Sequence, residues 1–176
     1  MSPEYANDTT KLFSSSSDGY FFTLLGALEH PFPRGSVHIP SNNASVHPVI
    51  DPQYISHPLD RKLLGIIALH LQKIAQTTPL SELVEQPGYH KLVEVNVEEW
   101  IKKSIQSEYH PAGACAMLPK EKGGVIDAKL KVNGTRNLRV VDPSIFPLLP
   151  RANIQTLVYA VAERAANWIK SECGDD

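Results

Sequence analysis

Apolar residues recur along this chain at spacings that predict three helices. In residues 58–76 they fall three or four positions apart, which is typical of a helix with one buried face. A second helix is expected to start at Asn96, because asparagine is a favoured N-cap and Glu99 follows three positions later. A third is expected over residues 153–170. The apolar positions of this third helix form a broad face: Ile154, Leu157, Val158, Val161, Ala162, Ala165 and Ile169.

Three shorter runs predict strands. Residues 20–28 are rich in aromatic and aliphatic side chains and predict a buried strand. Residues 36–39 alternate polar and apolar side chains, as a half-buried strand does. Residues 138–141 predict a short buried strand, whereas four prolines make residues 40–58 an extended connector. Strands and helices do not alternate, so we expect an α+β fold, a small and mostly antiparallel sheet packed against about three helices.

Charge and composition narrow the classes of partner. The net charge of -2 and the lack of a basic run give no electrostatic case for nucleic acid or an anionic membrane. No apolar stretch approaches the ~20 residues that a membrane span needs, and the N-terminus lacks the pattern of a signal peptide. With only two cysteines, a disulfide framework is not expected. We therefore expect a cytoplasmic protein whose partner is a small-molecule substrate.

The chain divides into a tail and one domain. Residues 1–18 are polar and serine-rich, so they are expected to be disordered or to form an interface. Residues 19–172 are expected to fold as a single domain. The sequence contains no motif of a nucleotide-binding glycine loop. Its histidines and cysteines do not have the spacing of metal ligands, so no metal site is expected.

Two residues are candidates for chemistry. His110 stands before Pro111 and Gly113, which hold it in a tight loop, and an imidazole can act as acid or base near neutral pH. Its structural interpretation is a histidine that ties down this loop. Asn153 stands where the third helix begins, so it is either an N-cap or an amide that holds a ligand oxygen.

Two further residues lie close to these candidates in the sequence. Asp142 ends the predicted strand 138–141, and it either forms an Asx turn with Ser144 or reaches a ligand site. Cys115 is a small core residue or, less simply, a nucleophile.

The order of several motifs resembles the C-terminal region of the glucose–methanol–choline (GMC) family of flavin oxidoreductases, fungal members above all. The motifs are residues 30–37, 50–54, 109–117, 124–127, 137–144 and 152–156. The resemblance implies that His110 is the catalytic acid/base and that Asn153 holds the substrate oxygen. It also implies that Asp142 and residues 153–156 lie against the flavin ring of FAD. The resemblance therefore implies that His110 and Asn153 are catalytic. It implies that three residues bind the substrate: Tyr109, Cys115 and Gln155. Where FAD is supplied, it implies that four residues bind the cofactor: Asp142, Asn153, Gln155 and Thr156.

The chain also departs from the family pattern. The dinucleotide-binding unit with its glycine fingerprint is not found in the sequence. Ala114 replaces a common threonine, and Ile154 stands where proline is frequent. From the first departure we expect a catalyst without a cofactor, one that cyclises, isomerises or closes a small apolar secondary metabolite in a pocket derived from the family.

Two alternatives stay open. The first is the C-terminal part of an FAD-dependent alcohol oxidase or dehydrogenase. The second is a non-catalytic remnant or interaction module. Because an uncovered apolar surface tends to find a partner, we also expect a homodimer.

Overall fold

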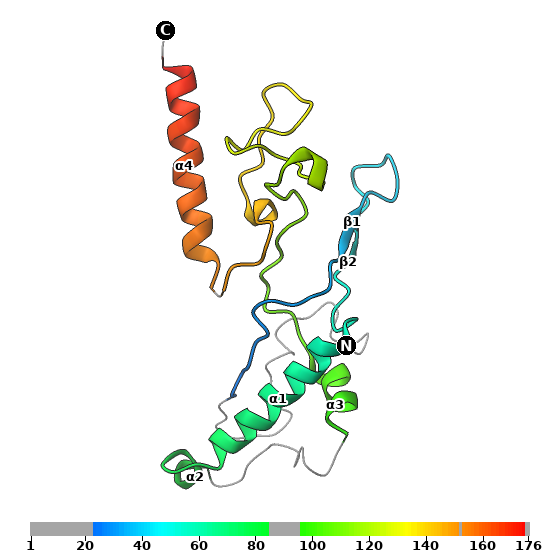
Figure 1. The fold of residues 1–176 in the computed structure, drawn as a ribbon, viewed down its shortest axis with the longest axis vertical. Coiled ribbons are helices and arrows are strands. Elements are labelled where there is room, and N and C mark those ends of the chain that lie inside the picture. The colour runs from blue at the N-terminus through cyan, green and yellow to red at the C-terminus, as the bar shows by residue number, and fades with distance from the viewer. Residues whose placement is uncertain (1–22, 85–95, 152, 175–176) are drawn as a thin grey trace. The chain divides into compact units, whose positions relative to one another are not determined.

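The computed structural model describes residues 23–84, 96–151 and 153–174 (Figure 1). The expected segment 1–18 lies outside the described residues. The described chain forms two compact units. One consists of residues 23–28 and Tyr54–Glu108, and the other of Glu29–Gln53 and the chain from Tyr109 onward.

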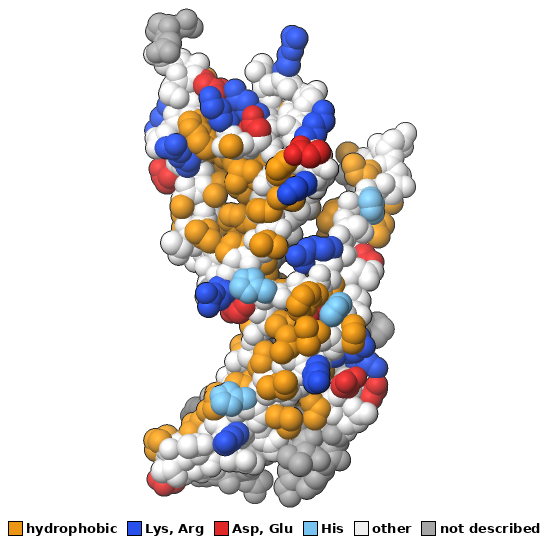
Figure 2. Space-filling model, in the orientation of Figure 1, with side chains coloured by type: hydrophobic (Ala, Val, Ile, Leu, Met, Phe, Trp, Pro, Cys, Tyr) orange, Lys and Arg blue, Asp and Glu red, His pale blue; other side chains and the backbone are white. Residues whose placement is uncertain are grey.

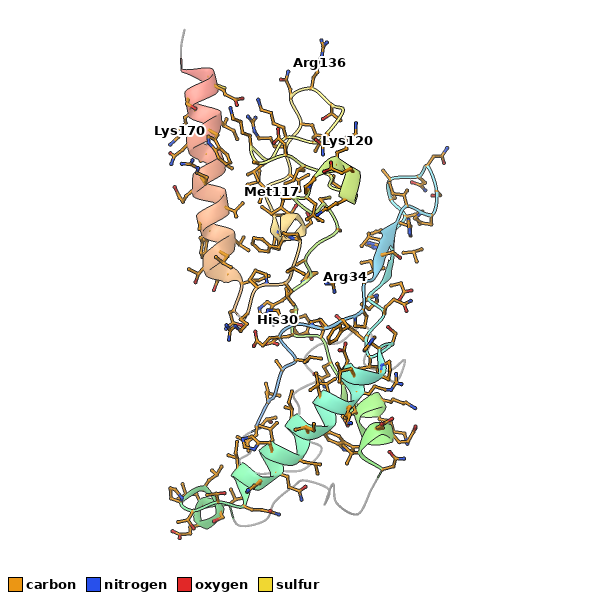
Figure 3. All side chains as sticks on the ribbon, in the orientation of Figure 1. His30, Arg34, Met117, Lys120, Arg136 and Lys170 are labelled. Atoms are coloured by element: carbon orange, nitrogen blue, oxygen red, sulfur yellow. The ribbon has the colours of Figure 1, made fainter. Side chains whose placement is uncertain are left out.

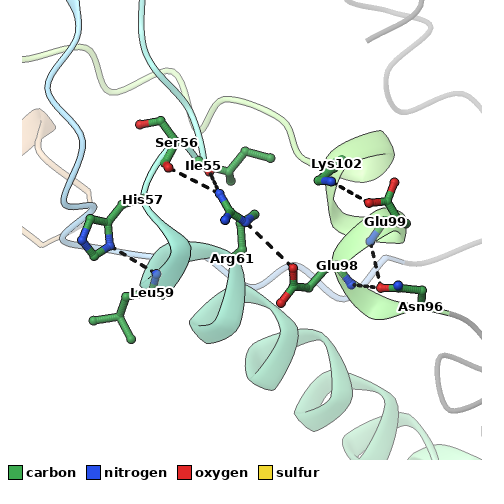
Figure 4. Close-up of polar contacts among 9 residues, drawn as sticks. All are labelled: Ile55, Ser56, His57, Leu59, Arg61, Asn96, Glu98, Glu99 and Lys102. Carbon is green, nitrogen blue, oxygen red and sulfur yellow. Dashed lines mark hydrogen bonds and ion pairs between the residues drawn. The ribbon is translucent and has the colours of Figure 1, made fainter.

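Helix α1 (Pro58–Ala75) organises the first unit, and the apolar spacing predicts its extent. The expected buried apolar face is wrong in part, because Leu59, Ile66 and Ile74 are exposed. The start of α1 is fixed locally, because Pro58 occupies the first turn and Nδ1 of His57 accepts a hydrogen bond from the backbone N–H of Leu59 (Figure 4). The short helix α2 (Leu80–Leu83) follows and was not predicted.

Helix α3 (Val97–Ser104) packs against α1. Oδ1 of Asn96 accepts hydrogen bonds from the backbone N–H groups of Glu98 and Glu99, so the predicted N-cap is confirmed (Figure 4). A Cβ on the buried Gly65 of α1 would lie 3.3 Å from Val97 Cγ1. The two helices therefore approach closely at this glycine.

The strand predicted at residues 20–28 is wrong for its described part, which carries no regular secondary structure. Residues 20–22 lie outside the described residues. A Cβ on Gly26 would come within 2.3 Å of the Ile67 side chain, so this segment lies against helix α1 rather than in a sheet.

The second unit contains a two-stranded antiparallel sheet. Strand β1 (Ser36–His38) confirms the predicted strand and pairs with β2 (Val49–Asp51), with Val37 opposite Ile50. The expected half-burial is wrong, because all three residues of β1 are exposed. Strand β2 lies in the stretch predicted as a connector. It was missed because a three-residue strand between two prolines has almost no local signal.

The core of the second unit is built mainly from loops and helix α4 (Gln155–Cys173). Ile126, Leu130, Ile145 and Ala165 are its buried residues, and the half-buried Trp168 of α4 packs against them. The stretch 138–141 is not the predicted buried strand: Leu138 is 51% exposed, and the segment pairs with residues 130–132 through a single bridge. Backbone hydrogen bonds from Val132 to Leu138 and from Val140 to Leu130 hold the pairing.

Much apolar surface stays uncovered in both units, as the orange side chains of Figure 2 show. Ile39 is 86% exposed, Leu25 74% and Tyr159 65%. Taken together, the small antiparallel sheet and the helices confirm the predicted α+β class. None of the described helices combines the length and the apolar character that crossing a membrane requires. In the same described ranges, no group of three histidine, cysteine or acidic residues could hold a metal ion.

Glu172 joins the end of α4 to Lys131 and Arg139 through ion pairs. Its two carboxylate oxygens lie 3.0 Å from Lys131 Nζ and 2.6 Å from Arg139 Nη2. The hydrogen bonds from Arg139 and Lys131 lower the pKa of Glu172 below its ordinary value of 4.5. A carboxylate with a lowered pKa in the folded state stabilises the fold above its ordinary pKa. That contribution is lost as the pH falls through the lowered value.

We predict that Glu172→Gln lowers the Tm at pH 7 by about 1–3 °C, because the substitution removes the negative charge that Lys131 and Arg139 both contact. The difference from the unmodified protein shrinks as the pH falls below 4.5 toward the lowered pKa of Glu172. Differential scanning calorimetry from pH 7 to pH 3 measures both effects, with Glu121→Gln as the matched control on an exposed carboxylate. A Tm deficit that stays constant across this range would contradict the assignment.

Candidate active site

The loop at His110 lies at the start of the longer segment of the second unit and has a constrained backbone. Tyr109 has φ +58 and Gly113 has φ +90, so both adopt the left-handed conformation. Pro111 restricts His110 between them to extended conformations. Tyr109 is 54% exposed and the His110 side chain is half-buried. The loop therefore presents a partly accessible imidazole from a backbone with little freedom.

Three backbone hydrogen bonds fasten this loop to a second segment. The N–H groups of Gly113, Cys115 and Met117 donate to the carbonyl oxygens of Pro143, Ser144 and Ile145, over 3.4, 2.9 and 2.8 Å. Ile145 is 1% exposed and anchors the second segment in the core. We call this pairing of residues 113–117 with Pro143–Ile145 the clip. It brings the predicted residue Cys115, half-buried, next to the turn at Asp142.

Asp142 forms the Asx turn that the sequence offered as one of its two interpretations. Its Oδ1 accepts a hydrogen bond from the backbone N–H of Ser144 over 2.8 Å and caps the 3-10 helix η5 (Pro143–Ile145). The carboxylate thus holds the carbonyl groups of the clip in place. Contact between Asp142 and FAD stays a prediction.

The start of helix α4 differs from the prediction. The N-cap is Ile154, which is 5% exposed, and no side chain caps the helix. The capping interpretation of Asn153 is therefore wrong. The buried position of Ile154 sets where the helix begins, and the neighbouring Asn153 remains exposed. Gln155 and Thr156 occupy the exposed first turn.

This uncapped helix end has a consequence for ligand binding. The first N–H groups of a helix have no partner within it, and they carry partial positive charge. The first turn of α4 contains no acidic residue, and in the described part of the chain no side chain accepts from it. An electron-rich ring edge or an anion can therefore bind these N–H groups.

His110 and Asn153 lie in the same unit, and no hydrogen bond joins them among the described residues. Their approach to one ligand therefore stays a prediction. A surface recess of about 350 Å³ lies elsewhere in this unit, beside Met117 and Lys120 (Figure 3), and no predicted site residue lines it. The carboxylate of Asp127 at this recess already accepts from the N–H groups of Lys129 and Lys131.

Sequence reasoning missed the part of the clip formed by Ser144 and Ile145. Their role rests on backbone carbonyl groups, which leave no mark in residue type. The available signal was the apolar Ile145 shortly after Asp142.

Comparisons with known proteins agree over most of the chain. The family model described as GMC oxidoreductase matches residues 31–162. The GMC oxidoreductase family protein Mala s 12 of Malassezia sympodialis is 39% identical over 150 residues, which is 84% of this chain and 24% of that protein. The chain thus spans about a quarter of the length of this relative.

Solved structures give the same result. A fungal aryl-alcohol oxidase matches with a TM-score of 0.69 and 34% identity, over 84% of this chain and 25% of that one. An FAD-dependent oxidoreductase from Chaetomium thermophilum matches with a TM-score of 0.71 and 29% identity, over 81% of this chain and 25% of that one.

These matches overturn the expectation of a catalyst without a cofactor, because the chain matches a quarter of an FAD-dependent enzyme. That expectation took the absence of a glycine fingerprint as loss of FAD, although the matched region is a different part of such proteins. The matches also favour the oxidoreductase alternative over the cyclase. The chain belongs to the GMC oxidoreductase family and corresponds to that family's C-terminal region.

Proposed function

We propose that this chain forms the substrate-side region of an FAD-dependent oxidoreductase that acts on the CH–OH group of a small alcohol. The observation that carries the proposal is the family match over residues 31–162, which includes both the His110 loop and the start of α4. The clip supports it, because it fixes the backbone beside His110 to a buried anchor.

The residues present fit one part of the cofactor. The uncapped N-terminus of α4 can donate hydrogen bonds to the electron-rich edge of a flavin ring, with the exposed Gln155 and Thr156 beside it. Asp142 contributes indirectly, since its Oδ1 is already engaged by the N–H of Ser144. When bound, FAD supplies the acceptor for the hydride that leaves the alcohol carbon.

The chain's own residues remove the hydroxyl proton of the alcohol and bind its oxygen. An imidazole nitrogen of His110 takes the proton of the alcohol hydroxyl, and the C–O bond becomes a carbonyl as the hydride leaves the carbon. The carboxamide of Asn153 donates a hydrogen bond to the same oxygen, on which negative charge develops. Tyr109 and Cys115 line the substrate side next to His110.

The test joins residues 31–176 to the remaining part of the fungal aryl-alcohol oxidase, in place of the region that they match. We predict a yellow protein that oxidises an alcohol and consumes oxygen. His110→Ala should lower kcat by about 10²–10⁴-fold, because proton transfer to a positioned base contributes that much. Asn153→Ala should lower kcat by about 10²-fold, because one donor to the oxygen is lost.

Oxygen consumption and flavin absorption are measured for each variant. His47→Ala is the matched control, since it removes an exposed imidazole from the loop between β1 and β2. A chimera without flavin would refute the cofactor assignment. A flavin-loaded chimera in which His110→Ala keeps full kcat would refute the role of that histidine.

Asp142 gives a second prediction, as a positioning residue. Asp142→Ala removes the acceptor of the Ser144 N–H and should loosen the clip by about 1 kcal/mol, which is typical of a lost cap. Amide hydrogen exchange at Cys115 and Met117 should then be faster by about fivefold. Asp142→Asn keeps an oxygen acceptor and should exchange like the unmodified protein. Equal exchange in both variants would show that the turn does not hold the clip.

A further inference from the structure

Asn133 and Gly134 form the only Asn-Gly dipeptide of the sequence, and they occupy the two central positions of a turn. The N–H of Thr135 donates to the carbonyl oxygen of Val132 over 3.2 Å and closes this turn. Of the two central residues only Gly134 has a positive φ, at +78. A positive φ at the second central position alone is the pattern of a type II turn.

The side chain of Asn133 is tied to a neighbouring segment. Its Nδ2 donates to the carbonyl oxygen of Gly124 over 3.0 Å. The partner fixes the orientation of the amide, because a carbonyl oxygen only accepts and the atom that faces it must be the nitrogen. The backbone N–H of Asn133 donates to the carbonyl oxygen of Val125 over 2.9 Å. Two hydrogen bonds therefore hold Asn133 against this segment.

The segment that Asn133 holds also contacts the clip. The N–H of Val125 donates to the carbonyl oxygen of Ala116 over 3.0 Å. The backbone of Gly124 lies so close to Leu118 that a Cβ on the glycine would overlap with the carbonyl oxygen of Leu118. The segment is therefore packed too closely to adapt when Asn133 changes.

An asparagine before a glycine can lose its side-chain amide in water without an enzyme. The backbone nitrogen of Gly134 attacks Cγ of Asn133, and a C–N bond forms between them. The bond from Cγ to Nδ2 breaks, and ammonia leaves with the proton of the attacking N–H. Water then opens the succinimide ring at either carbonyl, which gives aspartate or isoaspartate. Glycine favours this attack, because it has no side chain that shields its nitrogen.

The turn keeps the reacting atoms of Asn133 and Gly134 apart. Ring closure requires the nitrogen of Gly134 to approach Cγ of Asn133 to within about 3.5 Å, on the Cβ side of the backbone. The first central residue of a type II turn has an extended ψ, which directs the next nitrogen away from its side chain. The turn must therefore open before the reaction, and opening breaks the hydrogen bond from Asn133 to Gly124.

We propose that Asn133 is a deamidation site, that its hydrogen bond to Gly124 protects it, and that its products loosen the clip. An aspartate has no donor for the Gly124 carbonyl and places a negative charge against that oxygen. An isoaspartate also adds a carbon to the backbone of the turn. Either product weakens the hold on Val125 and hence its hydrogen bond to Ala116. The inference concerns the backbone beside the clip and is independent of the proposed function.

Peptide mapping of the full 176-residue chain by mass spectrometry measures the protection. Samples are kept at mildly alkaline pH, either folded or in urea. In urea, Asn133 should deamidate before any other asparagine, because glycine follows it alone. In the folded chain the same residue should react about tenfold more slowly, because its hydrogen bond to Gly124 must first break.

Thr135 supplies a matched pair of variants for the opening of the turn. Its Oγ1 donates to the carbonyl oxygen of Val132 over 2.9 Å. Thr135→Val removes this hydrogen bond and should raise the ratio of the folded rate to the rate in urea by about threefold. Thr135→Ser keeps the hydroxyl and should leave the ratio unchanged.

Asn133→Asp tests the consequence for the clip. Hydrogen exchange at the Val125 amide, which donates to Ala116, should be about tenfold faster than in the unmodified chain. Asn133→Ala loses the donor without adding a charge and should give about a threefold increase. The amide of Ile105, which donates to Ile101 in the other unit, should not change in either variant.

Four outcomes would overturn the proposal. The first is an equal rate at Asn133 in the folded chain and in urea. The second is a folded chain that yields no product at Asn133 while its other asparagines react. The third is an equal ratio for Thr135→Val and Thr135→Ser. The fourth is a Val125 amide that exchanges in Asn133→Asp as it does in the unmodified chain.

Discussion

The site depends on one constraint, the clip between residues 113–117 and Pro143–Ile145. Three backbone hydrogen bonds hold the loop that carries His110 against the segment that the buried Ile145 anchors in the core. The Asx turn of Asp142 fixes the carbonyl groups that accept them. An acid/base residue must be held in a narrow range of positions to transfer a proton efficiently, and a loop without such an anchor would not hold it.

Different parts of helix α4 contribute to the fold and to the site. Ala165 and Trp168 pack into the core, and Glu172 ties the last turn to Lys131 and Arg139. The first turn is left without a capping side chain, a cost of about 1 kcal/mol that a bound ligand can offset. A stable fold would favour a cap at this point, so its absence is consistent with a ligand-binding role.

Local signals predicted the elements that local interactions fix. Asn96 predicted α3 and the apolar spacing predicted α1, because a cap and a helical period are encoded within a few residues. Strand β2 and the extended stretch 138–141 were misjudged, because pairing partners distant in sequence decide both. The cap at Asn153 was wrong because burial of the next residue outweighed local preference. The pairing of His110 with Asn153 came from the order of the two residues along the chain and from family resemblance, because the local sequence also offered a structural interpretation of each residue.

The most direct measurement is a crystal structure of the chimera with FAD and a bound alcohol analogue. We predict that an imidazole nitrogen of His110 and the carboxamide nitrogen of Asn153 both lie within about 3.2 Å of the same ligand oxygen. We also predict that the first N–H groups of α4 face the flavin ring. A ligand oxygen bound away from both side chains, or a flavin ring remote from α4, would contradict the proposed site.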